Sequence, residues 1–374
     1  MTKRKIELAL LAVVAVILAA CGGDATETTA AGETTTTEAA TGELTPVRLQ
    51  LQWVTQAQFA GYFAAIEEGF YADAGLDVTI LEGAVDIVPQ QVVAAGGAEF
   101  GLAWVPKALV SREEGADIVN IGQVFQRSGT LEVSWADAGI TEPADWEGKR
   151  VGTWGFGNEF ELTAAFELYD VTPAEVIQQP FDMSLLLNNE LDAAQAMTYN
   201  EYAQVLEQEN PETGELYTDA DLSVIDFNDI GTAMLQDAIW ADAAWLADNE
   251  ATAQAFLKAS FQGWIFCRDN PDACVQIVLD RGPALGTSHQ AWQMNEINAL
   301  IWPSPGGIGV MDQGLWDQTV EVAVGQAVIS ADPGADAYRT DLAEAAVAEL
   351  EGEGLDVTGD GFQKTTVTLN PGGE

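Results

Sequence analysis

Aromatic and hydrogen-bonding side chains gather in this sequence at the ends of hydrophobic runs, where a folded chain can present them to a small molecule. Three rings end such runs and four more follow in adjoining turns or first helical turns: Trp53, Trp104, Trp154, Phe59, Tyr62, Phe156 and Tyr199. Side chains that form hydrogen bonds lie beside them: Gln58, Gln126, Asn158, Glu159 and Asn200. Rings stack on flat ligands, and amides or carboxylates bind the ligand's edge. We therefore expect this set to bind a flat heterocycle.

Core packing is the competing interpretation for some of these rings, because aromatic residues at helical spacing are usually buried. Tyr62 and Phe156 fit a core position and a site position equally well. The strand-end positions of Trp53 and Trp154 favour the site. Further tryptophans on helical patterns are expected in the core: Trp245, Trp264, Trp292 and Trp316.

The charge balance excludes several classes of function. The chain has 59 acidic and 14 basic residues, and its formal net charge is -45. Such a chain repels phosphate backbones, so we expect no nucleic-acid partner. The single histidine, His289, cannot build a multi-histidine metal site. Asp356, Thr358 and Asp360 resemble the start of a calcium loop, but Val367 stands where that loop needs a glutamate. We expect no metal and no cofactor.

The scarcity of cations also restricts the ligand. Sulfonates, phosphates and nitrate need convergent donors, preferably arginines, and only Arg127 is expected in a strand-end turn where a ligand could meet it. The glycine-rich turn at 155–158 opens a helix and offers backbone N–H groups, but Glu159 would compete there with an anion. A neutral or cationic aromatic ligand therefore fits better than an anion.

Hydrophobic periodicity alternates along the chain between the spacing of strands and that of helices. Strands are expected in the first part, with helices between them, at 47–53, 76–81, 99–105 and 118–125. A second cycle of strands begins near Trp146 and comprises 149–154, 191–197 and 222–227, after which the chain leads back through 232–240. The remainder is mostly helical: 250–269, 271–280, 288–301, 313–327 and 341–351. This alternation predicts an α/β protein with parallel strands.

Two lobes follow from the two cycles. We expect residues 46–130 to begin the first lobe, residues 131–228 to form the second, and residues 229–374 to complete the first with a helical C-terminal region and tail. The chain would cross between the lobes twice, which makes a two-segment hinge. In open parallel sheets ligands bind beyond the carboxyl ends of the strands, so the site is expected in the cleft between two doubly wound lobes.

The N-terminal residues have the composition of an export signal. Residues 1–20 combine a positive start with an apolar stretch, and they resemble a bacterial lipoprotein signal that ends before an acylated Cys21. Residues 21–45 are rich in Thr, Glu and Ala and predict a disordered, lipid-anchored linker. The expected protein is extracytoplasmic and is anchored to the cell membrane by lipid alone.

The two remaining cysteines lie close together in a connection between two expected helices. Cys267 and Cys274 are separated by six residues. Exported proteins meet oxidising conditions, so this spacing predicts a disulfide.

Several motifs of this chain resemble the thiamine-pyrimidine-synthase-like family of periplasmic binding proteins. They are the run at 51–62, the segments at 68–71 and 75–78, and the glycine-containing segments at 96–101 and 148–152. That family shares the type II periplasmic-binding-protein fold with sulfonate and taurine binders. The resemblance implies a substrate-binding subunit that delivers its ligand to an ABC transporter permease, and we expect this subunit to be a monomer. It also implies a thiamine pyrimidine precursor or a riboflavin-like vitamin as the ligand.

Enzymes of the same family form the pyrimidine from pyridoxal phosphate and a histidine of their own chain. Where the family typically has this histidine, after Trp53, this chain has Phe59. It also lacks the cysteine-rich motif of the enzymes. We therefore expect a binding protein and no enzyme; a pyrimidine-forming enzyme, a binder of a sulfonate-type anion and a sensory domain remain the alternatives.

We predict that the protein begins at a diacylated Cys21 and fractionates with membranes, because small residues and a cysteine follow the apolar stretch. Cys21→Ser should prevent acylation without changing the folded part of the chain. Intact mass spectrometry of protein from its native host tests this. An unmodified Cys21 would contradict it.

Overall fold

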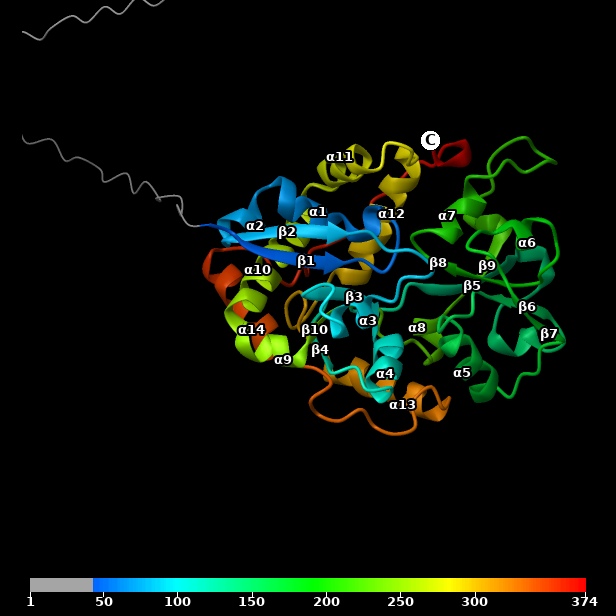
Figure 1. Cartoon of the computed structure of the whole chain (residues 1–374). Helices are drawn as coiled ribbons and strands as arrows, with labels where there is room; N and C mark the ends of the chain where they lie inside the picture. Colours follow the sequence, from blue (N-terminus) through cyan, green and yellow to red (C-terminus); the bar gives the residue numbers. More distant parts are fainter. Residues whose placement is uncertain (1–42) are drawn as a thin grey trace, which may run out of the picture. The chain divides into compact units, whose positions relative to one another are not determined.

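The computed structural model describes residues 43–374, whose arrangement is shown in Figure 1. The expected signal peptide at 1–20, the lipid attachment at Cys21 and nearly all of the linker at 21–45 lie outside the described residues. The described chain forms two groups of strands, each with its own helices, which we call the first and second lobes.

The first lobe is built on a five-stranded sheet with the order β2-β1-β3-β10-β4. Its strands are β1 Thr45–Gln50, β2 Leu76–Leu81, β3 Phe100–Trp104, β4 Ile118–Gln123 and β10 Asp237–Asp242. Strand β1 is parallel to β2 and β3, whereas β10 runs antiparallel to β3 and β4. Every residue of β3 and β4 is buried, as expected for central strands covered on both faces. The sheet is therefore mixed, and the expectation of parallel strands is wrong for β10.

Helices cover this sheet, and most of them come from the C-terminal part of the chain. They are η1 Ala57–Phe59, α1 Ala60–Glu67, α2 Phe70–Asp73, α3 Pro89–Ala94, α4 Val105–Glu113, α9 Ala243–Asp248, α10 Glu250–Asp269, α11 Pro271–Arg281, α12 Thr287–Ile301, α13 Gln313–Gly325 and α14 Asp341–Gly352. Helices α1 and α10 approach very closely, since a Cβ atom at Gly263 would lie 2.0 Å from the carbonyl oxygen of Gly61. Glycine is required there by packing.

The second lobe holds a three-stranded sheet, β8-β5-β9, and a two-stranded sheet, β6-β7. Its strands are β5 Thr130–Trp135, β6 Arg150–Thr153, β7 Glu175–Gln178, β8 Ala194–Met197 and β9 Leu222–Asp226. Its helices are η2 Ala136–Ala138, η3 Pro143–Trp146, α5 Phe160–Leu168, α6 Ser184–Leu187, α7 Glu201–Leu206, η4 Asp219–Asp221 and α8 Phe227–Ile230. A parallel bridge between Val151 and Ala193 connects the two sheets. Strand β5 is antiparallel to both of its neighbours, so this lobe is mixed as well.

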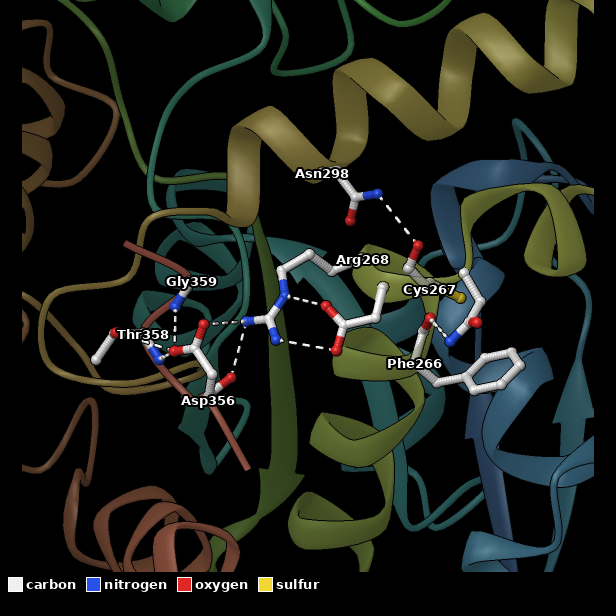
Figure 2. Close-up of polar contacts among 9 residues, drawn as sticks. Phe266, Cys267, Arg268, Asn298, Asp356, Thr358 and Gly359 are labelled. Atoms are coloured by element: carbon white, nitrogen blue, oxygen red, sulfur yellow. Dashed lines mark hydrogen bonds and ion pairs between the residues drawn. The ribbon is translucent and has the colours of Figure 1, made fainter. Parts of the chain in front are cut away.

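The C-terminal segment returns to the first lobe beside α10, where a disulfide joins Cys267 to Cys274 with their Cα atoms 5.4 Å apart. Arg268 forms ion pairs with the carboxylates of Asp269 and Asp356, and Figure 2 shows it beside Asp356. The Asp356 carboxylate also accepts hydrogen bonds from the backbone N–H groups of Thr358 and Gly359. The segment that resembles a calcium loop is thus a turn fastened to α10. A final turn, η5 Pro371–Gly373, follows it.

Among residues 43–374, no helix is both long and apolar enough to cross a membrane.

The disulfide should contribute on the order of 2 kcal/mol to the free energy of unfolding, because it closes a short loop between α10 and α11. We predict that urea unfolding with a reductant present gives a lower midpoint than unfolding without it. The double variant Cys267→Ala, Cys274→Ala is the control, and its midpoint should not respond to the reductant. Equal midpoints for the parent protein in both conditions would contradict a stabilising bond.

Candidate functional site

A cavity of about 470 Å³ is lined by residues of both lobes. Trp104 ends β3 and Trp53 follows β1 in the first lobe, while Trp154 follows β6 and Tyr199 follows β8 in the second. The carboxyl ends of these strands therefore meet at the cavity, where a ligand site is expected in folds of this kind. Its volume lies within the range of roughly 300–1,000 Å³ that is usual for small-molecule sites.

Eight of the residues expected to bind a ligand line this cavity: Trp53, Gln58, Trp104, Trp154, Phe156, Asn158, Tyr199 and Asn200. The other four, Phe59, Tyr62, Gln126 and Glu159, are not among its lining residues. Their side chains have structural partners instead.

Phe59 and Tyr62 lie in the core, with 0% and 1% of their surface exposed. The close packing of α1 against α10 explains this, since the Tyr62 ring lies edge-on to Trp264 at a centroid distance of 5.6 Å. The Gln126 amide donates to the carbonyl oxygens of Gln123 and Val310. These contacts correct the expectation that the three side chains face a ligand.

The Glu159 carboxylate turns back on its own loop and accepts a hydrogen bond of 2.8 Å from the backbone N–H of Gly157. The Glu159 carboxylate therefore does not take the position at the edge of a ligand that was expected for it. It also fills the position of an anion at this turn.

Phe181 is an additional aromatic residue of the cavity, and it lies between the two tryptophans that were expected to stack on a ligand. Its ring centroid is 4.9 Å from that of Trp53 and 6.3 Å from that of Trp154, with which it is nearly parallel. Phe181 belongs to the second lobe and Trp53 to the first, so the ring connects the lobes. It follows a proline in an irregular segment, where no strand-end or helical pattern identifies it.

Phe156 is the most exposed large apolar side chain of the cavity, with 67% of its surface exposed. Its φ angle of 56° lies in the left-handed region, as do those of Gly155 and Gly157. A non-glycine residue there costs of order 1–3 kcal/mol unless something compensates. Val85 and Val88 are also exposed and line the same cavity. These three side chains give the cavity an exposed apolar wall.

Asp237, the first residue of β10, holds part of the cavity wall in position. Its carboxylate accepts hydrogen bonds from Gln52, from Gln58 at 2.9 Å and from the indole N–H of Trp104 at 2.9 Å. All three donors line the cavity. Burial raises the pKa of Asp237 to about 6, although the three hydrogen bonds act in the opposite direction.

Lys107, in the first turn of α4, is the single cationic residue among those that line the cavity. Its ammonium donates a 2.7 Å hydrogen bond to Oδ1 of Asn158 in the second lobe and lies 4.8 Å from the ring centroid of Trp104. Burial lowers the pKa of Lys107 to about 8. Arg127, expected to be the cation nearest a ligand, instead donates to the carbonyl oxygens of Leu300 and Pro303.

A polar group from α12 supports the edge of the cavity. The two ring nitrogens of His289 are 2.7 Å from Oε1 of Glu207 and 2.9 Å from Oδ1 of Asn200. Asn200 in turn donates to Glu201, a buried carboxylate that also lines the cavity. Burial raises the pKa of Glu201. This contact was not predicted, because His289 lies far from the second lobe in the sequence.

Within residues 43–374, no group of three or more His, Cys, Asp or Glu side chains is arranged so that it could hold a metal ion.

The fold is that of the periplasmic binding proteins. The aliphatic sulphonate binding protein SsuA from Escherichia coli superimposes with a TM-score of 0.55 and 14% identity, over 86% of this chain and 92% of that protein. Residues 56–274 match the family described as NMT1/THI5 like, and this chain belongs to that family.

Proteins with different roles are among the relatives. A formylaminopyrimidine-binding protein from Halalkalibacterium halodurans is 23% identical over 63% of this chain and 70% of its own length. The riboflavin-binding protein RibY from Chloroflexus aurantiacus is 24% identical over 77% and 83%. A 4-amino-5-hydroxymethyl-2-methylpyrimidine phosphate synthase from Aspergillus parasiticus is 20% identical over 63% and 70%. The family thus contains both binding proteins and enzymes.

The raised pKa of Asp237 predicts a pH-dependent contribution to stability. The folded protein retains a proton that the unfolded chain releases above pH 3.8, so this contribution is present below pH 3.8 and is lost as pH rises through about 6. Between pH 4 and 7 the loss should reach about 3 kcal/mol at most. We expect it in urea unfolding of the parent protein but not of Asp237→Asn.

Replacing an exposed aspartate, Asp77→Asn, provides the matched control, which should follow the parent protein. If Asp237→Asn showed the same pH dependence as the parent protein, the burial of an ionising carboxyl under the cavity would be contradicted.

Proposed function

We propose that this protein is the solute-binding subunit of an ABC importer and that its cavity captures a flat heterocycle, such as a thiamine pyrimidine precursor or a riboflavin-like vitamin. One observation carries the proposal: aromatic rings from both lobes, Trp53, Trp104, Trp154, Phe156, Phe181 and Tyr199, surround one cavity at the strand ends. Flat aromatic faces bind flat ligands by stacking and burial. The names of the formylaminopyrimidine-binding and riboflavin-binding relatives support the same class of ligand.

The positions of the reactive side chains support binding over catalysis. His289 is bonded to Glu207 and Asn200, and among the described residues it does not line the cavity. Cys267 and Cys274 form a disulfide and are fully buried. An enzyme that consumes its own histidine, or that uses thiols, would need these groups beside the ligand. The synthase reaction is the second candidate function, because the family includes such enzymes.

Electrostatics favours a heterocycle over a sulfonate. A sulfonate carries a full negative charge, and its binding needs several convergent donors. The cavity offers one cation, Lys107, together with the carboxylates of Glu114 and Glu201. A neutral ring with hydrogen-bonding groups on its edge is compatible with both signs of charge.

The proposed protein works at the outer face of the cell membrane, next to its permease. Lipid on Cys21 would hold the chain at the outer face of the cell membrane, and the linker at 21–45 would let the folded part reach its permease as a monomer. A ligand that touches rings of both lobes stabilises the closed arrangement of the lobes. That arrangement would be the one the permease recognises.

Phe156 offers a test that separates binding from folding. We predict that Phe156→Gly weakens heterocycle binding by roughly 5- to 100-fold, because a stacked ring is lost from the cavity. Stability should stay within about 1 kcal/mol of the parent protein, since the ring is exposed and glycine accepts a positive φ. Isothermal titration with riboflavin and with 4-amino-5-hydroxymethyl-2-methylpyrimidine measures the first effect, and urea unfolding the second.

Trp245→Ala is the matched control, because Trp245 packs against Phe100 away from the cavity. It should reduce stability and leave the dissociation constant unchanged. Trp154→Ala is less informative, since Trp154 is only 3% exposed and its loss would also affect folding. Tight binding of an alkanesulfonate, with no heat from either heterocycle, would contradict the proposed ligand class.

A further inference from the structure

Lys107 brings a positive charge into an acidic protein at a cavity that both lobes line. It follows Trp104 by three residues, so the turn from β3 into α4 places the indole ring and the ammonium side by side. The whole chain has 14 basic residues, and of these Lys107 lines this cavity.

The ammonium of Lys107 has more hydrogen-bonding capacity than its protein partners use. It has three N–H donors, and among the described residues its one hydrogen-bond partner is Oδ1 of Asn158, at 2.7 Å. No carboxylate of residues 43–374 lies within 4.0 Å of it to form an ion pair. Charges that burial largely removes from water, as it does Lys107, are normally paired and fully hydrogen-bonded.

Two carboxylates attract the Lys107 ammonium electrostatically but accept no hydrogen bond from it. Asp237 is already held by Gln52, Gln58 and Trp104, and Glu159 accepts from the backbone of Gly157. Both raise the pKa of Lys107, yet burial outweighs them and leaves that pKa lowered. The remaining donors of the ammonium are therefore available to a molecule in the cavity.

We infer that Lys107 is the specificity-determining residue of this cavity and that the ligand presents to it a carbonyl oxygen, either on its ring or in a formyl group. The inference rests on the proposed function and narrows it to heterocycles that carry a carbonyl group. An acceptor completes the hydrogen bonding of the ammonium, which the Trp104 ring beneath it holds in place by a cation–π contact.

Titration with two probes tests the inference. Riboflavin carries two ring carbonyls, and 4-amino-5-hydroxymethyl-2-methylpyrimidine carries none. The parent protein should bind riboflavin more tightly. Lys107→Met keeps the apolar stem and removes the charge, and it should weaken riboflavin binding by about 10- to 100-fold, the usual effect of losing a charge-assisted hydrogen bond. The dissociation constant of Lys107→Met for the pyrimidine should differ from that of the parent protein by less than about threefold.

Lys149→Met is the matched control, because Lys149 lies outside the cavity in the second lobe. It should bind both probes as the parent protein does. Lys107→Arg keeps a donor and a charge, so it should recover part of the riboflavin affinity. A cavity that needs only the stem of the lysine for packing would not distinguish the methionine variant from the arginine variant.

Riboflavin binding by the parent protein should weaken as pH rises from 7 to 9, because Lys107 loses its proton near pH 8. The acidic groups that face it or share the cavity are Asp237, Glu159, Glu114 and Glu201. Asp237 titrates near pH 6, below this range. Lys107→Met and Lys107→Arg should both lack the weakening near pH 8.

The outcomes separate the two levels of the proposal. If the parent protein binds riboflavin and Lys107→Met binds it equally well, the inference about Lys107 is wrong and the proposed function stands. If the parent protein binds the pyrimidine without a carbonyl more tightly than riboflavin, the inference about Lys107 is likewise wrong and the proposed function stands. Binding of neither probe overturns both.

Discussion

The position of β10 is the constraint on which the rest of the structure depends. This strand returns from the second lobe and lies antiparallel between β3 and β4 of the first. The chain therefore has to cross between the lobes twice, once after β4 and once before β10. The two crossings join the lobes, and residues of both lobes line the cavity between them.

The same strand also organises the cavity. Asp237 begins β10, and its carboxylate binds side chains from three places in the first lobe: Gln52 after β1, Gln58 in η1 and Trp104 at the end of β3. These contacts orient residues that line the cavity before any ligand arrives. A wall that is ordered in advance loses less entropy on binding. The buried carboxyl is the cost in stability of that preorganisation.

The wall of the second lobe is arranged differently. Phe156 has a positive φ between two glycines and remains largely exposed, while hydrogen bonds to the carbonyl oxygen of Gly155 and from the N–H of Gly157 hold the turn in place. Phe181 packs between Trp53 and Trp154 and brings aromatic surface of both lobes together. Strained or exposed aromatic side chains at a cavity are typical of ligand contacts, because the bound molecule supplies the missing packing.

Helices and strand-end residues could be predicted from the sequence because local patterns determine them. The long helix α10 begins and ends where its hydrophobic period predicts, and Trp53, Trp104 and Trp154 line the cavity because the carboxyl ends of strands meet there. Phe59 was misplaced, and Tyr62 takes the core position that was left open for it, because helical spacing does not show which neighbour a helix face meets.

Contacts between distant segments could not be predicted. The roles of Asp237 and His289 depend on partners that lie far away in the chain, and Lys107 lies within a helix whose orientation the sequence does not define. Strands β5 and β7 were missed, and β7 is largely exposed, so it carries little hydrophobic signal. Pairing with a neighbouring strand forms β7 more than its own composition does, whereas the alternation of apolar and polar residues in β5 was a strand signal that was overlooked.

The most direct measurement is the identity of the molecule that the protein carries when it is purified gently from its own host. The protein would be denatured and the released small molecule identified by chromatography and mass spectrometry. Our account predicts a flat heterocycle that bears a carbonyl group and absorbs in the ultraviolet, released in proportion to the protein. Release of an alkanesulfonate or another aliphatic anion would contradict the central claim that the aromatic cavity between the lobes selects its ligand by stacking.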